Sequence, residues 1–192
     1  MTAQVRWFDA TQIRIARVQA EKIELLALQF PVLTETLLAD WSFSGRINHP
    51  PVFAPDGDRV LLAAYTPQIT NLEIYQFQPG ANDILNLSNR RSHNDSLPEW
   101  SPDGSRIAYR MSGDGQQTIL VMNADGSDHR ILWQERSTTI SNLRWSADGQ
   151  RIAYVRLQPG QSALCILALI GSEPDCSFRG YAFRSVEWKP FG

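Results

Sequence analysis

The chain has 192 residues, a formal net charge of −2 and 20% charged residues, a length that suffices for one domain with its own core. The absence of a basic field argues against binding to nucleic acid or to an anionic membrane surface. No stretch approaches 18 uninterrupted apolar residues, so no membrane insertion is expected. Residues 1–6 lack the basic and apolar regions of a secretion signal, which predicts a cytoplasmic location if the chain is complete.

The N-terminal part of the chain is predicted to form four strands. Ile13–Val18 alternates apolar and polar residues, as a half-buried strand does. Residues 20–30 place apolar side chains at spacings that a helix could also use, so the local pattern leaves strand and helix open. Comparison with the later units favours a strand over Ile23–Phe30 and another over Thr36–Ser44, with Pro31 in the turn between them.

The next unit contains three apolar runs that indicate strands, near Arg59–Tyr65, Asn71–Phe77 and Ile84–Leu87. Gln78–Gly80 holds Pro and Gly side by side and supplies a hairpin turn between the second and third runs.

The third unit is the most regular. Pro102–Gly104 is a turn, because Pro presets its backbone angle, Asp hydrogen-bonds the backbone ahead and Gly accepts a left-handed conformation. The runs Ile107–Tyr109 and Thr118–Met122 have the composition of strands, and Asp125–Gly126 is a second hairpin signal. His129–Leu132 completes a set of four strands.

One aromatic residue recurs near the start of each unit, and successive ones are separated by 46, 47, 45 and 43 residues. These residues are Trp7, Phe53, Trp100, Trp145 and Trp188. Four short strands in about 45 residues are typical of a β-propeller blade rather than of a helix pair. We therefore predict an all-β propeller, one domain over residues 1–192, with about four four-stranded blades. The predicted blades are 1–46, 47–92, 93–139 and 140–184, with a turn at 171–175 in the last and the start of a further blade at 185–192.

The order of residues in the third unit resembles the WD-like repeat of TolB-type propellers, which also occurs in prolyl-oligopeptidase-like propellers. The matching residues are Leu87–Ser88, Asp95, Pro98, Trp100–Gly104, Ile107–Tyr109, Ser112, Gly115, Ile119, Val121–Asn123, Asp125–Ser127 and Leu132. Such propellers commonly have six blades, so the resemblance implies an open arc or a fragment of a larger propeller. An open arc exposes blade edges, and self-association through them is expected.

The turn aspartates Asp56, Asp103 and Asp148 are each followed three residues later by an arginine, at positions 59, 106 and 151. One interpretation is a ring of charges for a ligand. We favour the other, in which each aspartate closes its turn and each arginine covers a blade edge, because a repeated unit conserves what its fold requires. The repeated aromatics are likewise assigned to packing between blades.

No catalytic, phosphate-binding or metal-binding motif is found, so no enzymatic activity, cofactor or metal is predicted. The loops at one rim of the channel are the candidate site, and His49 and His93 are expected near each other there. The candidate partner-binding residues are Asn48, His49, His93, Asn94, Asp95, Ser112 and Asp114. For Asp95 we favour a bond to the backbone at the blade entrance over contact with a partner.

Cys165 and Cys176 flank the turn of the last complete hairpin. This symmetry is compatible with a disulfide across two strands and equally with two buried free thiols. A disulfide would favour an oxidising compartment such as the periplasm.

The resemblance implies a non-enzymatic scaffold at the cell envelope that docks a protein or peptide partner at the channel rim. In TolB-type proteins the partners are a peptidoglycan-associated lipoprotein and other Tol components. The alternative is the propeller of a prolyl-oligopeptidase-like serine peptidase, which filters substrates for a separate α/β-hydrolase domain that is absent from these residues. A Gly-x-Ser-x-Gly segment downstream in the coding sequence would favour the peptidase.

Overall fold

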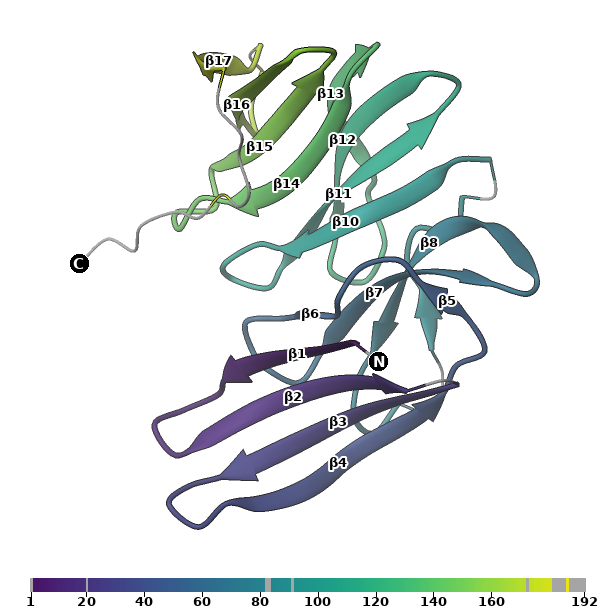
Figure 1. The fold of residues 1–192 in the computed structure, drawn as a ribbon, viewed down its shortest axis with the longest axis vertical. Coiled ribbons are helices and arrows are strands. Elements are labelled where there is room, and N and C mark those ends of the chain that lie inside the picture. Colours follow the sequence, from purple (N-terminus) through teal and green to yellow (C-terminus); the bar gives the residue numbers. More distant parts are fainter. Residues whose placement is uncertain are drawn as a thin grey trace. The chain divides into compact units, whose positions relative to one another are not determined.

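The computed structural model describes residues 2–19, 21–81, 84–90, 92–171, 173–180 and 186, and within these ranges every regular element is a β-strand. The chain divides into two compact units, Met1–Arg91 and Ser92–Gly192, each containing two sheets (Figure 1). The strands of the first unit are β1 (Thr2–Trp7), β2 (Gln12–Gln19), β3 (Lys22–Gln29), β4 (Thr34–Ser42), β5 (Arg46–Ile47), β6 (Val52–Phe53), β7 (Val60–Thr66), β8 (Ile69–Phe77) and β9 (Leu85–Asn86). Those of the second are β10 (Asn94–Trp100), β11 (Arg106–Gly113), β12 (Gln116–Asn123), β13 (Arg130–Arg136), β14 (Thr139–Trp145), β15 (Arg151–Gln158), β16 (Gln161–Ala168) and β17 (Asp175–Arg179).

Each sheet is antiparallel, and apart from β5 and β6, which both pair with β7, strands that follow one another in a sheet lie side by side. We call β1–β4 blade 1, β5–β9 blade 2, β10–β13 blade 3 and β14–β17 blade 4. The predicted all-β architecture is confirmed. The strand predicted over Ile23–Phe30 is β3, so the helical alternative for that region is wrong.

The inner position of blade 2 is filled by two short strands, β5 and β6, which both pair with β7. Pro50 and Pro51 lie between them. Since proline has no backbone N–H, these two residues cannot continue the ladder of hydrogen bonds, and the strand is interrupted there.

The core of the first unit lies between one face of blade 1 and the facing side of blade 2. Blade 1 contributes Ala16, Val18, Ile23, Leu25, Trp41 and Phe43, and blade 2 contributes Phe53, Val60, Leu62, Ala64, Tyr75 and Phe77. Aromatic rings meet edge to face within it, with ring centres 5.6 Å apart for Trp41 and Phe77. The alternation of apolar residues along each strand therefore places one apolar surface on each side of this junction.

The core of the second unit repeats this arrangement. Ala108, Ile119 and Val121 of blade 3 pack against Ile140, Leu143, Trp145, Ile152, Tyr154, Ala163, Cys165 and Leu167 of blade 4. Cys165 in β16 and Cys176 in β17 form a disulfide. Of the two states left open by the sequence, the structure shows the bridged one.

Replacing Leu62, which is completely buried in the core of the first unit, by alanine should lower the free energy of unfolding by about 2–5 kcal/mol. The cause is the lost burial together with the cavity that remains. Denaturant unfolding monitored by circular dichroism measures the change. Leu33→Ala is the matched control, because the Leu33 side chain is 66% exposed and its truncation should change stability by less than about 0.5 kcal/mol. Equal effects of the two substitutions would contradict this assignment of the core.

Candidate functional site

Several of the residues predicted to form the rim lie towards one end of the strands of their unit. In the first unit this end carries the β2–β3 turn, the β4–β5 connection and the β7–β8 turn, because Lys22 pairs with both Gln19 and Ser42, and Arg46 pairs with Tyr65. In the second unit the topologically equivalent end of the strands carries the β11–β12 turn, the end of β13 and the start of β14. We call this the rim end of each unit.

Five predicted rim residues come from the second unit. Asn94 begins β10 and lies opposite Ser112 in β11, whose hydroxyl donates to the Asn94 carbonyl at 3.4 Å. Asp114 lies in the turn that follows. His93 contacts this turn, since a side chain at Gly113 would clash with the His93 ring. The second unit therefore brings His93, Asn94, Ser112 and Asp114 together at its rim end.

The remaining predicted residues are placed differently. Asp95 is completely buried in β10, a position that suits the structural alternative better than contact with a partner. Asn48 and His49 lie in the first unit, between β5 and β6, where the Asn48 N–H donates to the Ala63 carbonyl at 3.0 Å. The proximity of His49 and His93, which belong to different units, stays a prediction.

The sequence did not indicate a cavity of about 430 Å³ at the rim end of the first unit. It is lined by Glu21, Ser44, Gly45, Arg46, Tyr65, Thr66 and Pro67. The Arg46 guanidinium carbon lies 5.9 Å from the centre of the Tyr65 ring, within reach of a cation–π interaction. The cavity therefore combines a cation, an aromatic ring and the carboxylate of Glu21.

Gly45 shapes this cavity. A Cβ at this position would clash with the ring of Phe43 and would lie 2.6 Å from the Tyr65 carbonyl oxygen, so any larger residue would push β5 away from β7. The sequence contains a hint of this close approach, because Gly45 directly precedes Arg46 and belongs to none of the predicted turns. Its meaning depends on the close approach of Phe43, which spacing alone does not reveal.

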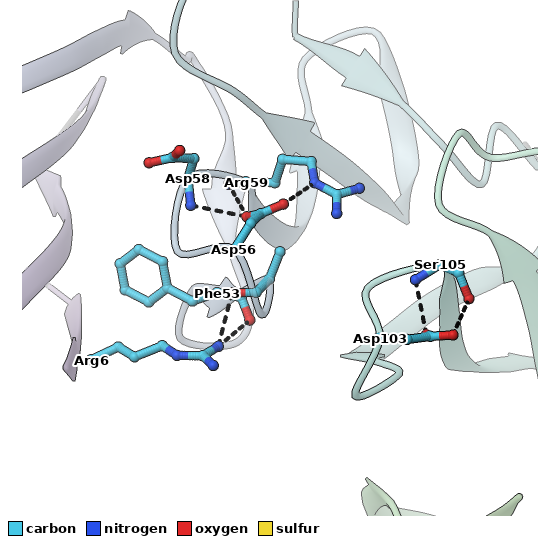
Figure 2. A network of polar contacts seen from close by, with 8 residues as sticks. Arg6, Phe53, Asp56, Asp58, Arg59, Asp103 and Ser105 are labelled. Atoms are coloured by element: carbon cyan, nitrogen blue, oxygen red, sulfur yellow. Dashed lines mark hydrogen bonds and ion pairs between the residues drawn. The ribbon is translucent and has the colours of Figure 1, made fainter. Parts of the chain in front are cut away.

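The opposite end of the strands carries the Asp-Gly turns (Figure 2). Asp56 accepts hydrogen bonds from the backbone N–H groups of Asp58 and Arg59 and from Nε of Arg59. Asp103 accepts from the Ser101 and Ser105 hydroxyls at 2.6 and 2.8 Å. In this network each carboxylate closes its own turn.

Blade 4 repeats the serine and aspartate of this turn. Asp148 accepts from the Ser146 hydroxyl at 2.6 Å and from the Gln150 N–H at 3.0 Å. The Ser146 hydroxyl in turn accepts from the Arg151 N–H at 2.9 Å, as the Ser101 hydroxyl does from Arg106. The turn is therefore one hydrogen-bonded unit that holds the start of the next strand.

The repeated aromatics differ in burial. Phe53, Trp100 and Trp145 are at most 6% exposed, and Phe53 and Trp145 belong to the cores of their units. Trp7 differs from the expectation, because its side chain is 62% exposed. Trp188 lies outside the described residues.

A polar junction joins blades 3 and 4. Arg144 Nη1 lies 3.1 Å from Glu99 Oε2, and the Trp145 indole N–H donates to the Glu99 carbonyl at 3.0 Å. Burial raises the pKa of the Glu99 carboxyl to about 7, and the attraction of the nearby Arg144 charge lowers it only in part. Glu99 is thus a carboxyl that gains a proton near neutral pH.

No group of three His, Cys, Asp or Glu side chains within the described part of the chain is arranged to hold a metal ion. No helix in the same residues is long and apolar enough to cross a membrane.

Replacing Asp103 by alanine should lower the free energy of unfolding near neutral pH by about 1–2 kcal/mol, because several hydrogen bonds of the turn are lost. The Ser101 hydroxyl and the other donors hold the pKa of Asp103 down at about 2. A carboxyl whose pKa is lower in the folded state stabilises above its unfolded pKa, and the effect disappears as pH falls from about 4 towards 2. Denaturant unfolding of both proteins across this range measures the difference. Glu173→Ala, at an exposed position, is the control, and a difference independent of pH would contradict the assignment.

The carboxyl of Glu99 makes stability fall as pH rises, whereas that of Asp103 makes it rise. Glu99→Gln should therefore make stability fall less steeply with rising pH. With a folded pKa near 7, the folded state binds more protons than the unfolded state between about pH 4.5 and 7, so stability falls as pH rises, by at most about 1.4 kcal/mol per pH unit. Glutamine removes this contribution, while the histidines contribute equally in both proteins. Unfolding measured at intervals across this range gives the two slopes, and identical slopes would refute the raised pKa.

The comparisons with known proteins agree on one fold. A family model of the TolB beta propeller domain matches residues 34–173. The Tol-Pal system protein TolB of Anaeromyxobacter dehalogenans strain 2CP-C is 34% identical over 91 residues, which are 47% of this chain and 20% of that protein. TolB of Anaeromyxobacter sp. strain K is 33% identical with the same coverage. The matched region thus spans a fifth of the length of these curated relatives.

Solved structures add the arrangement of the strands. TolB from Acinetobacter baumannii superposes with a TM-score of 0.68 at 19% identity, covering 95% of this chain and 45% of that one. An oligogalacturonate lyase in complex with manganese gives 0.71 at 12% identity, covering 92% and 52%. A prolyl endopeptidase gives 0.65 at 14% identity, covering 94% and 30%. At such identities these structures show a shared propeller fold. Because the family model also covers most of the sequence, the chain belongs to the TolB β-propeller family.

Proposed function

We propose that the chain is a non-enzymatic interaction scaffold that binds a protein or peptide partner at the rim end of its first unit. The curated relatives are named as Tol-Pal system proteins, which supports a role of the Tol-Pal type. The partner that we propose on the family resemblance is a peptidoglycan-associated lipoprotein.

The cavity of about 430 Å³ at the rim end of the first unit carries this proposal. Arginine and tyrosine are enriched among residues that dominate binding at protein interfaces, and Arg46 and Tyr65 both line this cavity. The guanidinium group offers several fixed donors to a carboxylate or a peptide carbonyl of the partner. Glu21, at the same cavity, offers acceptors to partner N–H groups. The chemistry of the cavity is therefore suited to an extended polar peptide segment.

We further propose a periplasmic or cell-envelope location. The disulfide between Cys165 and Cys176 supports it, because such bonds persist in oxidising compartments.

A second function has specific support. The fold is shared with a prolyl endopeptidase and with a puromycin-hydrolyzing peptidase, at TM-scores of 0.65 and 0.64. Under this alternative the same rim end would filter peptides for a hydrolase domain of the same polypeptide. A Gly-x-Ser-x-Gly segment downstream in the coding sequence would favour this alternative over the Tol-Pal role.

Isothermal titration calorimetry of the chain with the soluble domain of the peptidoglycan-associated lipoprotein of A. dehalogenans tests the proposal. We expect saturable binding that Arg46→Ala and Tyr65→Ala each weaken about ten-fold or more, equivalent to about 1.4 kcal/mol, because both side chains line the cavity. His93→Ala probes the rim end of the second unit in the same way.

Arg130→Ala is the matched control, since this exposed arginine begins β13 at the end opposite the rim. It should leave the affinity within two-fold of the unsubstituted protein. The rim assignment is wrong if Arg130→Ala weakens binding as much as Arg46→Ala. Absence of any binding heat with the lipoprotein domain would remove the Tol-Pal role.

A further inference from the structure

Blade 3 carries an arginine where the other three blades carry a buried apolar residue. In each blade the repeated aromatic pairs with an apolar residue of the following strand, which is Ile13, Val60, Ile107 or Ile152. Three positions further along that strand, blades 1, 2 and 4 have Ala16, Ala63 and Val155, all at most 1% exposed. Blade 3 has Arg110 there. Because the other blades form without a cation at this position, the fold does not require one.

The Arg110 side chain is held in place by two hydrogen bonds. Its Nε donates to the Ser96 hydroxyl at 3.0 Å, and its Nη1 donates to the Ile140 carbonyl at 2.8 Å. Ser96 lies opposite Arg110 in the sheet and is completely buried, and Ile140 is the second residue of β14. The guanidinium is therefore fixed between blades 3 and 4, close to the rim end of the second unit.

Among the described residues, no carboxylate forms an ion pair with Arg110. Arg156, which pairs with Ile140 across β14 and β15, has its own carboxylate partner, because its Nη1 lies 3.7 Å from Glu135 Oε2. Burial lowers the pKa of Arg110, and no acidic neighbour acts in the opposite direction. Nη2 of Arg110 makes no hydrogen bond with a described residue, so its two N–H donors remain available to a ligand.

An arginine in this state is suited to a carboxylate. A guanidinium stays charged even when burial removes part of its hydration, and a carboxylate that replaces the lost water forms a charge-assisted hydrogen bond. Phosphate groups are recognised by clusters of arginines, whereas Arg110 offers one guanidinium with one free nitrogen. Ser112 lies on the same face of β11, two residues nearer to the rim end, so the approach to Arg110 is polar.

We propose that Arg110 binds the side-chain carboxylate of an acidic residue of the partner at the rim end of the second unit. Nη2 donates to a carboxylate oxygen, while Ser96 and Ile140 keep the guanidinium in place. The proposal rests on the proposed function only for the source of the carboxylate, which is a protein or peptide. It adds a contact in the second unit to the cavity of the first.

An NMR titration of the full chain with a small carboxylate tests this inference. The probe is the amide of N-acetylglutamate, and the signals followed are the Arg110 Nε–H and the Ser112 backbone N–H. We expect both signals to shift saturably at low ionic strength, where chloride competes least. The amide of N-acetylglutamine, which lacks the charge, should leave them unchanged. Because the probe is not the lipoprotein, failure of the lipoprotein to bind does not affect this result.

Two arginine variants assign the binding to its position. Arg110→Met should weaken binding of the glutamate probe at least ten-fold, measured by the Ser112 signal, and it should still unfold cooperatively because other blades have apolar residues there. Arg130→Met is the matched control, since it removes the same charge from an exposed position at the opposite end of the strands and should leave the affinity within two-fold.

The inference is overturned by any of three results. The first is the absence of a saturable shift with the glutamate probe. The second is equal binding of the glutamine probe, which would mean that the charge is not recognised. The third is an equal effect of Arg110→Met and Arg130→Met, including no effect of either, which would mean that the carboxylate does not bind at Arg110.

Discussion

The constraint on which this structure depends is that every four-stranded sheet has two apolar faces. In β11 the consecutive residues Ile107, Ala108 and Tyr109 are all completely buried, although successive side chains of a strand point to opposite sides. A sheet of this kind cannot leave either face in water without losing burial of large apolar side chains. Within each unit two blades therefore pack face to face, and the exposed Trp7 of blade 1 is one place where this requirement is not met within the described residues.

Most of the fold could be predicted from the sequence, because its signals are local and repeated. The turn at Pro102–Gly104 identifies the strands on both sides, and the period of about 45 residues carries that assignment to regions such as Ile23–Phe30, where the local pattern also allows a helix. The repeat could not predict where an individual blade differs from the shared pattern. One such difference is the split between β5 and β6 at Pro50–Pro51, which the other blades do not contain. Another is the exposure of Trp7, which depends on packing against it and not on the repeated residues.

The candidate site was predictable only in part, for a related reason. Sequence position placed His93, Asn94 and Ser112 at one end of a strand pair, and hydrogen bonding in β10 and β11 brings them together. The cavity beside Arg46 was missed, because it depends on the close approach of Phe43 to Gly45, which is a property of side-chain packing. The disulfide was undecided, because the symmetry of Cys165 and Cys176 about a turn fits two states equally.

Comparison of blades 3 and 4 shows which backbone strain belongs to the fold and not to a binding site. Leu97 and Asn142 have positive φ angles of 55° and 54°, in a region that costs a residue with a side chain about 1 kcal/mol or more. Each lies three residues before the blade's tryptophan, at a bulge in the inner strand. Because the same strain recurs at the same place in blades 3 and 4, it belongs to the way an inner strand bends. The cavity at Arg46 and Tyr65 is lined by side chains that are not part of the repeated turn, and this makes it the better candidate for recognition.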